Sequence, residues 1–274
     1  MSLTQFRMIV WPLVAWLASA TLMPMQQEPR LSEEEMKMFL LTARVVNDKS
    51  TSGISFFRLT LSDGNITHDA AFHKVNAYNQ SYRYDIAAYE LCKLLGLGDM
   101  MPVTVERRWR GDVGAISWWL PIMMDEAERL KKSIKPPDID AWQKQMYKKM
   151  IFTELVYDTT PNLSNTLISE DWHLWMIDFS RGFRLYKDLR APRNIAESRC
   201  PRRLFENLRG LSRDKLTERT RRFLNKREID ALMARRDRIV AIYEDLIRKK
   251  GEQEVLYDDP AVTRSSPAAQ GIKI

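Results

Sequence analysis

The sequence has few of the residues that build the common metal and disulfide sites. Its 274 residues include two cysteines, Cys92 and Cys200, and three histidines. The two cysteines form neither a zinc motif nor a disulfide framework, although one bridge between them could form in an oxidising compartment. His68, His73 and His173 have no mutual spacing that fits a metal site. Zinc-dependent and disulfide-stapled folds are therefore not indicated.

Glycine is also scarce, with 10 residues in the whole chain. Nucleotide-binding proteins often have a glycine-rich loop near their first strands, because its backbone amides can approach phosphate groups closely. The only glycines in the matching region here are Gly53 and Gly64. No internal repeat is evident either. The sequence thus gives only a weak signal of a phosphate-binding loop.

The remaining composition is that of an ordinary globular protein. Hydrophobic residues make up 45% and charged residues 29% of the chain, which leaves ample apolar material for a core. The length allows one large domain or two small lobes. The net charge of +7 favours acidic partners and carries no information on the fold.

Residues 1–25 differ from the rest of the chain. Arg7 precedes a mostly apolar run, and Ala18-Ser19-Ala20 offers a small-residue cleavage site. This pattern favours a secretory signal peptide, which would make the protein periplasmic or secreted. An uncleaved N-terminal anchor, which would tie the protein to a membrane, and a buried N-terminal helix are the alternatives.

Residues 32–120 predict a small β-rich unit. Ser32 and Glu35 form a capping box that begins a helix reaching to about Val46. A polar loop over residues 47–53 follows. Alternating apolar residues and turn signals then predict, in order, strands 54–61 and 66–75, a helix over 84–97, and strands 103–109 and 115–120. This order of helix, hairpin, helix, hairpin indicates an α+β fold with a small antiparallel sheet.

Residues 121–257 predict a helical unit. Apolar residues at three- and four-residue spacings indicate helices over residues 123–132, 139–157, 201–211, 212–224 and 226–251. Asn225 marks the break between the last two helices. Residues 258–274 are rich in Ser, Pro, Ala and Gly and predict a disordered tail.

Residues 155–183 hold the strongest functional signal of the chain. Asn165 begins a predicted strand over residues 166–168, and Asp178 follows another over residues 174–177. Antiparallel pairing of these strands brings Asn165 and Asp178 to the same end of the hairpin. An amide and a carboxylate oxygen there suit Mg²⁺, and phosphoryl-transfer sites hold their metal in this way.

Three passages resemble the atypical branch of the protein-kinase-like fold. Residues 70–74 (AAFHK) resemble the strand that bears the nucleotide lysine. Residues 84–91 (YDIAAYEL), with residues 94–97 and 101–105, resemble the helix and strand that follow it. The third passage is the hairpin of residues 155–183. This branch includes phosphatidylinositol 3-/4-kinase-related proteins, HipA-like bacterial proteins and secretory-pathway kinases.

The resemblance implies a two-lobed fold and an ATP- and Mg²⁺-dependent phosphotransferase that acts on a protein or small-molecule acceptor. Asp178 and Asn165 would bind the metal. Lys74 would contact the nucleotide phosphates, and Asp85 or Glu90 would be its partner on the following helix.

One departure from the family pattern concerns the catalytic base. Such loops place an aspartate five residues before the metal asparagine, and that position is Thr160 here. Asp158 lies two residues earlier, and we consider it as a substitute base. If it does not substitute, the protein is a catalytically impaired pseudokinase that acts as a binding or regulatory module.

The region from Arg184 to Lys250 is basic, with 21 Lys or Arg against 10 Asp or Glu. A groove for nucleic acid or a contact with an anionic membrane is the third hypothesis. The acidic residues are interspersed, however, and no nucleic-acid motif is present. A solvated helix surface with ion pairs is therefore favoured, and membrane contact is expected only through an uncleaved N-terminal segment.

Overall fold

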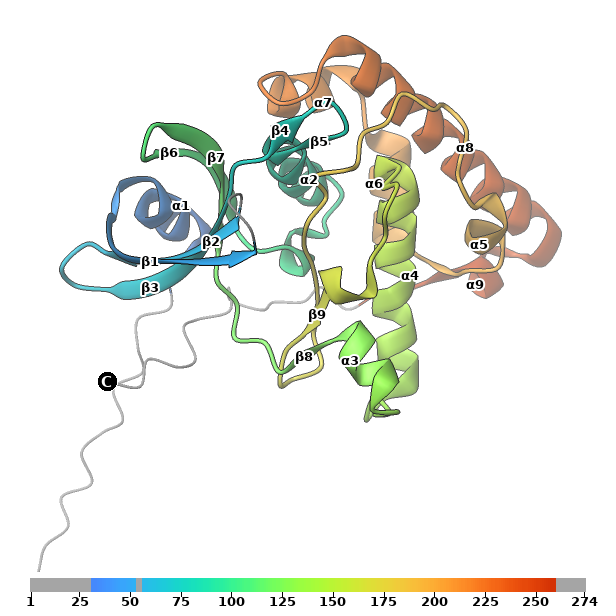
Figure 1. Ribbon diagram of the computed structural model, residues 1–274. Helices are drawn as coiled ribbons and strands as arrows, with labels where there is room; N and C mark the ends of the chain where they lie inside the picture. The colour runs from blue at the N-terminus through green and yellow to red at the C-terminus, as the bar shows by residue number, and fades with distance from the viewer. Residues whose placement is uncertain (1–30, 53–55, 260–274) are drawn as a thin grey trace, which may run out of the picture.

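The computed structural model describes residues 31–52 and 56–259 (Figure 1). The predicted signal peptide or anchor, and residues 260–274 of the predicted tail, lie outside these residues. Helices and strands form a mixed α+β fold, with an antiparallel sheet beside a group of helices, so the predicted α+β class with a small antiparallel sheet is confirmed, while the two-lobed arrangement stays a prediction. Among the described residues, no helix is long and apolar enough to cross a membrane.

The main sheet has five antiparallel strands in the order β1-β2-β3-β7-β6. They are β1 (Arg44–Ser52), β2 (Phe56–Ser62), β3 (Thr67–His73), β6 (Thr104–Trp109) and β7 (Asp112–Trp118). The β6–β7 turn consists of Arg110 and Gly111, both with positive φ, at 50° and 86°. Two such residues match the right-handed twist of a hairpin, so this turn is tighter than the one predicted over residues 110–114.

One face of the sheet is apolar and packs on α1 (Glu33–Thr42). Phe72 of β3 is fully buried and lies opposite Ile116 of β7. Trp118, which lies on the same face, meets Phe39 of α1 edge to face at 5.7 Å between ring centroids. Since alternate strand residues share a face, this packing also fixes which β3 side chains point the other way.

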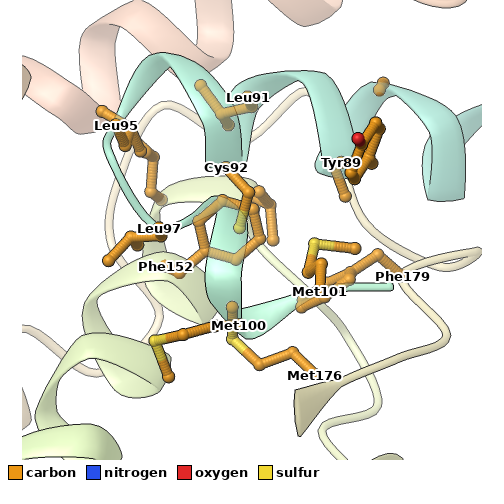
Figure 2. Packing of buried hydrophobic residues seen from close by; sticks show 14 of the residues in the cluster. Tyr89, Leu91, Cys92, Leu95, Leu97, Met100, Met101, Phe152, Met176 and Phe179 are labelled. Carbon is orange, nitrogen blue, oxygen red and sulfur yellow. The ribbon is translucent and has the colours of Figure 1, made fainter. Parts of the chain in front are cut away.

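The helix α2 (Tyr82–Leu94) joins the sheet to the helical part of the molecule. Cys92 of α2 points towards Phe152, and both belong to the same buried cluster as Met176 (Figure 2). Phe152 is fully buried on α4 (Ile139–Val156), and its ring meets that of Phe179 at 5.1 Å. Apolar contacts therefore join α2, α4 and the segment after the predicted metal hairpin in one core.

A second, three-stranded sheet carries the hairpin. Its order is β10-β9-β8, where β8 is Met124–Asp125, β9 is Thr166–Ile168 and β10 is Leu174–Met176. The remaining described α-helices are α3 (Glu126–Lys131), α5 (Pro192–Ala196), α6 (Arg202–Gly210), α7 (Arg213–Thr220), α8 (Lys226–Lys250) and α9 (Glu252–Val255). Short 3₁₀ turns lie at Gly98–Met100 and Leu163–Asn165. Two further strand pairs are formed by β4 (Asn76–Ala77) with β5 (Gln80–Ser81) and by β11 (Cys200–Pro201) with β12 (Leu256–Tyr257).

Helix ends follow the predicted caps. Ser32 and Glu35 form the capping box of α1, and Asn225 begins α8 with a second box completed by Glu228. Each box satisfies amide groups that the first helical turn leaves unpaired. Asn225 thus breaks the chain between α7 and α8 as predicted.

Three predictions about local structure were wrong. The polar loop over residues 47–53 belongs largely to β1, because ladder bonds to β2 stabilise a strand that has no apolar alternation of its own. The first helix ends at Thr42 rather than near Val46. The helix predicted from residue 123 begins later, because Met124 and Asp125 form a strand before α3.

The two cysteines, Cys92 and Cys200, are both buried free thiols, so the bridge considered between them is not formed.

Candidate active site

The hairpin brings Asn165 and Asp178 together. Thr166 pairs with Met176 in the β9–β10 register, and the Ile177 amide donates to the Asn165 carbonyl oxygen at 3.1 Å. The two side chains are in contact, with the Asn165 Nδ2 donating to Asp178 Oδ2 at 3.3 Å. The placement therefore agrees with the antiparallel pairing expected from the sequence. The metal-binding role of the two residues stays a prediction.

Asp178 has a strained backbone and a fixed side chain. Its φ of 56° lies in the left-handed region, which side-chain-bearing residues rarely adopt. Its Oδ1 accepts a hydrogen bond from Ser180 Oγ at 2.5 Å, and Gln80 Nε2 donates to that same hydroxyl oxygen at 3.0 Å. Strain that neighbouring contacts hold in place is typical of functional positions.

Asp85 links α2 to the residue that follows Asp178. It is buried, its Oδ1 accepts from the Phe179 amide at 2.7 Å, and its Oδ2 lies 3.1 Å from His73 Nδ1. Burial raises the pKa of Asp85, the bond and charge of His73 oppose this, and the charge of Asp178 adds to it. The carboxylate of Asp85 therefore sets the position of the backbone next to Asp178.

The expected partnership of Lys74 with the helix was wrong. Lys74 Nζ pairs with Asp112 at 2.7 Å and lies 5.5 Å from the centre of the Phe57 ring. Glu90 instead faces Arg219, with 3.7 Å between charged atoms. Strand β3 ends at His73, so Lys74 lies beyond the strand, although the sequence predicted a strand over residues 66–75, and its side chain pairs with Asp112 at the start of β7 rather than with α2. Nucleotide-binding roles for Lys74 and Glu90 remain predictions from the resemblance.

Asp158 is buried at the end of α4, directly after Tyr157, whose φ of 52° is also left-handed. Its Oδ1 accepts the Thr160 amide at 3.0 Å, so it caps its own loop. Burial raises the pKa of Asp158, the Thr160 bond opposes this, and the charge of Asp178 adds to it. The negative charge of Asp178 thus acts on the carboxyl group of Asp158. Within the described residues, no hydrogen bond joins it to Asn165 or Asp178.

The other two histidines have structural partners. His68 Nε2 lies 3.0 Å from the Trp119 carbonyl oxygen, and His173 Nε2 lies 2.6 Å from that of Asp99. The part of the chain that the structure describes contains no group of three or more His, Cys, Asp or Glu side chains that could hold a metal. The resemblance assigns two protein ligands to the metal, Asn165 and Asp178.

Two oxygen ligands from the protein fit Mg²⁺ better than a transition metal. Mg²⁺ commonly keeps several waters and is held by one or two carboxylates together with substrate phosphates. The amide oxygen of Asn165 and the carboxylate of Asp178 are hard donors of this kind. The residues present therefore fit the metal that the resemblance implies.

His73, Gln80 and Ser180 were not predicted as part of the site. A signal for His73 was present in the strand pattern, because Phe72 is the apolar residue that must enter the core and its neighbours must then face outward. Gln80 and Ser180 meet across 100 positions of sequence, and no local pattern predicts such a contact.

Comparison with known proteins gives one line of similarity, and it is structural. No family model matches the sequence, and no curated protein sequence matches it. The fold is similar to the crystal structure of a Helicobacter pylori proinflammatory kinase, CtkA, with a TM-score of 0.54 and 8% identity, covering 78% of this chain and 98% of that chain. At this identity the likeness concerns the fold alone. The chain thus has a kinase-like fold.

Proposed function

We propose that the protein is a kinase-like phosphotransferase that uses ATP and Mg²⁺ to phosphorylate a protein or small-molecule acceptor. The observation that carries this proposal is the contact of Asn165 with Asp178, at 3.3 Å, at the end of the β9–β10 hairpin. The kinase-like fold supports it, since kinases hold Mg²⁺ with an aspartate and an asparagine at such positions.

Each residue of the site then has a defined task. Asn165 and Asp178 hold Mg²⁺, which neutralises charge on the phosphate groups during transfer. Asp85 holds the Phe179 amide and thereby orients Asp178, while Ser180 fixes the second oxygen of that carboxylate. Asp158, whose raised pKa makes it a stronger base than an ordinary aspartate, accepts the acceptor's proton.

The second candidate is a pseudokinase that binds nucleotide without transferring phosphate. Two observations favour it. Thr160 occupies the position of the family's base, and the carboxylate of Asp158 is bonded to the Thr160 amide within its own loop. Loss of a base slows phosphoryl transfer without removing nucleotide binding, because transfer depends mainly on positioning and charge stabilisation.

Thermal unfolding with and without nucleotide tests the shared part of both candidates. A ligand at 100 times its Kd stabilises a protein by about 2.7 kcal/mol, which corresponds to several degrees in Tm. We expect ATP with Mg²⁺ to raise the Tm of the wild type and of Glu170→Gln, an exposed control on the same hairpin. Asp178→Asn should lose the increase. If millimolar ATP and Mg²⁺ leave the wild-type Tm unchanged, neither candidate stands.

Release or transfer of the γ-phosphate separates the two candidates. For the enzyme we expect turnover with a general acceptor protein, and Asp158→Asn should reduce kcat by about 100-fold or more while KM for ATP stays similar. Nucleotide binding with no turnover in the wild type would favour the pseudokinase.

A further inference from the structure

His73, the last residue of strand β3, and Lys74, which follows it, have different partners in the structure. Lys74 lies over Phe57, which is paired with Phe72 on the face covered by α1. His73 lies on the other face and reaches Asp85 on α2. In this structure it is therefore His73, and not Lys74, that reaches Asp85, while Lys74 is engaged by Asp112.

His73 lies inside the candidate active site. Its side chain is 15% exposed, and its Nδ1 is 3.1 Å from the Asp85 carboxylate. Asp178 is near enough for its charge to act on the imidazole. Among the described residues, the other ring nitrogen, Nε2, forms no hydrogen bond. In the imidazolium form both ring nitrogens carry a proton, so Nε2 is then a donor available to a ligand while Nδ1 donates to Asp85.

The charged surroundings of His73 are acidic. Asp85 faces it from α2, and Asp178 faces it from the segment after β10. The neighbouring strands contribute uncharged residues, Phe56 from β2 and Ala115 from β7. A protonated imidazole is the group that these carboxylates favour, and it has the geometry to donate to Asp85 and to a ligand at the same time.

We propose that His73, rather than Lys74, is the cation that contacts the phosphate groups of the bound nucleotide, and that its bond to Asp85 positions the Phe179 amide next to Asp178. This inference rests on the proposed function and names the phosphate-contacting residue of the same site. A chain of contacts then runs from the phosphates through His73 and Asp85 to the metal ligand Asp178.

The proposal predicts that nucleotide affinity depends on pH. Burial lowers the pKa of His73, but the bond and charge of Asp85 together with the charge of Asp178 outweigh burial and raise the pKa above the usual 6.5. The imidazolium form is thus present at lower pH and is lost as pH rises through this raised pKa. Affinity for ATP should fall over the same range.

Calorimetric titration of MgATP into three variants at pH 6.5 and pH 8.5 tests the assignment. A charge-assisted hydrogen bond to phosphate corresponds to a loss of about 10- to 100-fold in affinity when it is removed. We expect His73→Gln to show this loss at pH 6.5. His73→Lys should bind at both pH values, because an ammonium group keeps its charge, whereas wild-type affinity should fall at pH 8.5. Lys74→Gln is the competing variant.

The outcomes separate the inference from the proposed function. If Lys74→Gln loses affinity and His73→Gln does not, Lys74 is the phosphate contact and the kinase-like function stands without this inference. If wild-type affinity is the same at both pH values, the imidazolium role is overturned. If the wild type does not bind MgATP, both proposals fail.

A measurement on the nucleotide-free protein tests the positioning role independently and detects misfolded variants. The imidazole protons of His73, followed by NMR during a pH titration, should report a pKa above 6.5 in the wild type and a lower one in Asp85→Asn. The Phe179 amide should exchange with solvent faster in Asp85→Leu, which cannot accept its hydrogen bond. Unchanged titration and exchange would overturn the link from His73 to Phe179.

Discussion

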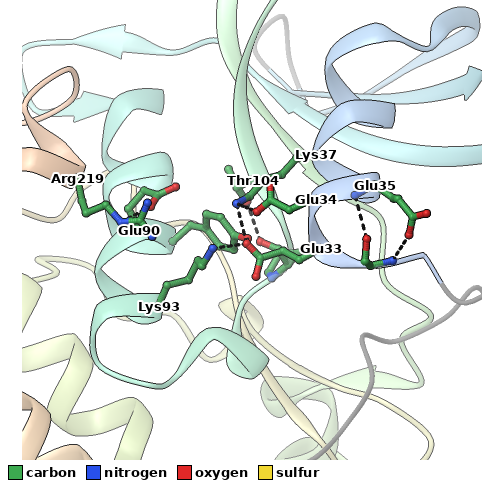
Figure 3. Close-up of polar contacts among 11 residues, drawn as sticks. Glu33, Glu34, Glu35, Lys37, Glu90, Lys93, Thr104 and Arg219 are labelled. Carbon is green, nitrogen blue, oxygen red and sulfur yellow. Dashed lines mark hydrogen bonds and ion pairs between the residues drawn. The ribbon is translucent and has the colours of Figure 1, made fainter.

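Two polar clusters flank α2, and they differ in how their charges are balanced. The first lies between α1 and α2, where Glu33 accepts from Lys37 at 2.7 Å, from Tyr89 at 2.7 Å and from Lys93 (Figure 3). Burial raises the pKa of Glu33, but these three hydrogen bonds outweigh it and lower the pKa to about 2. The negative charge of Glu33 is therefore balanced within the protein, by the ammonium groups of Lys37 and Lys93.

The second cluster is the candidate active site, where the charge of Asp178 acts on both Asp85 and Asp158. Burial and this repulsion by Asp178 raise the pKa of Asp85 and of Asp158. His73 offsets part of this charge at Asp85, and Lys149 and Arg190 offset part of it at Asp158. The comparison teaches that the Glu33 cluster holds α1 and α2 together, whereas the candidate active site keeps an excess of negative charge that a bound cation would neutralise.

The largest effect is expected where the active-site cluster rests on the core. Phe179 is 3% exposed and packs against Phe152. Phe179→Ala removes this contact and leaves a cavity, which should lower the free energy of unfolding by about 3–5 kcal/mol in urea titrations. A loss below about 1 kcal/mol would mean that the site does not depend on the shared core.

Removing the Glu33 carboxylate should lower the free energy of unfolding by less than Phe179→Ala does. Glu33→Ala leaves Lys93 and the Tyr89 hydroxyl without their shared acceptor, and we expect a loss of about 1–2 kcal/mol in the free energy of unfolding. Glu34→Ala is the matched control, since its side chain is 79% exposed and its ion pair within the described residues is with Lys37. Equal losses in the two variants would contradict a special role for Glu33.

Acid unfolding sharpens the same comparison. Because the folded-state pKa of Glu33 is lowered to about 2, from 4.5, its contribution to stability is present above pH 4.5 and is lost as pH falls towards 2. Glu33→Gln should therefore lose less stability than the wild type between pH 4.5 and pH 2. Parallel curves for the two proteins, measured by urea unfolding at each pH, would show that the Glu33 bonds do not form in solution.

The smallest change in the free energy of unfolding is expected at Asp158, where substitution should stabilise the protein rather than destabilise it. An acid with a raised pKa binds a proton more tightly in the folded state, so stability falls as pH rises above the unfolded value of 3.8 and stays low above the folded pKa. Asp158→Asn keeps an acceptor for the Thr160 amide and removes the buried charge. It should be more stable than the wild type at pH 7, by about 0.5–1 kcal/mol, in urea titrations. A decrease would mean that Asp158 is paired with a cation.

The sequence predicted the hairpin because its signals are local. Asn165 and Asp178 bracket two short apolar strands, and antiparallel pairing leaves one arrangement for their side chains. The helix caps at Ser32 and Asn225 were predictable for the same reason, since each box spans one helical turn. The α+β class followed from the order of such local elements.

The choice between His73 and Lys74 depended on tertiary packing. His73 is the last residue of β3 and Lys74 follows it, and no local pattern tells which of two neighbouring residues reaches the helix. The contacts of His73 with Asp85 on α2 and of Lys74 with Asp112 on β7 decide it, and both partners lie on other elements of the fold. The polar strand β1 was missed for a similar reason, because its partner β2 stabilises it.

Mg²⁺ binding to the active-site cluster is the central claim, and calorimetry tests it most directly. Mg²⁺ is titrated into the protein in the presence of a non-hydrolysable ATP analogue, for the wild type, Asp178→Asn and the exposed control Glu170→Gln. Our account predicts saturable Mg²⁺ binding in the wild type and the control, and its loss in Asp178→Asn. Binding that is equally strong in Asp178→Asn, or absent from the wild type, would contradict it.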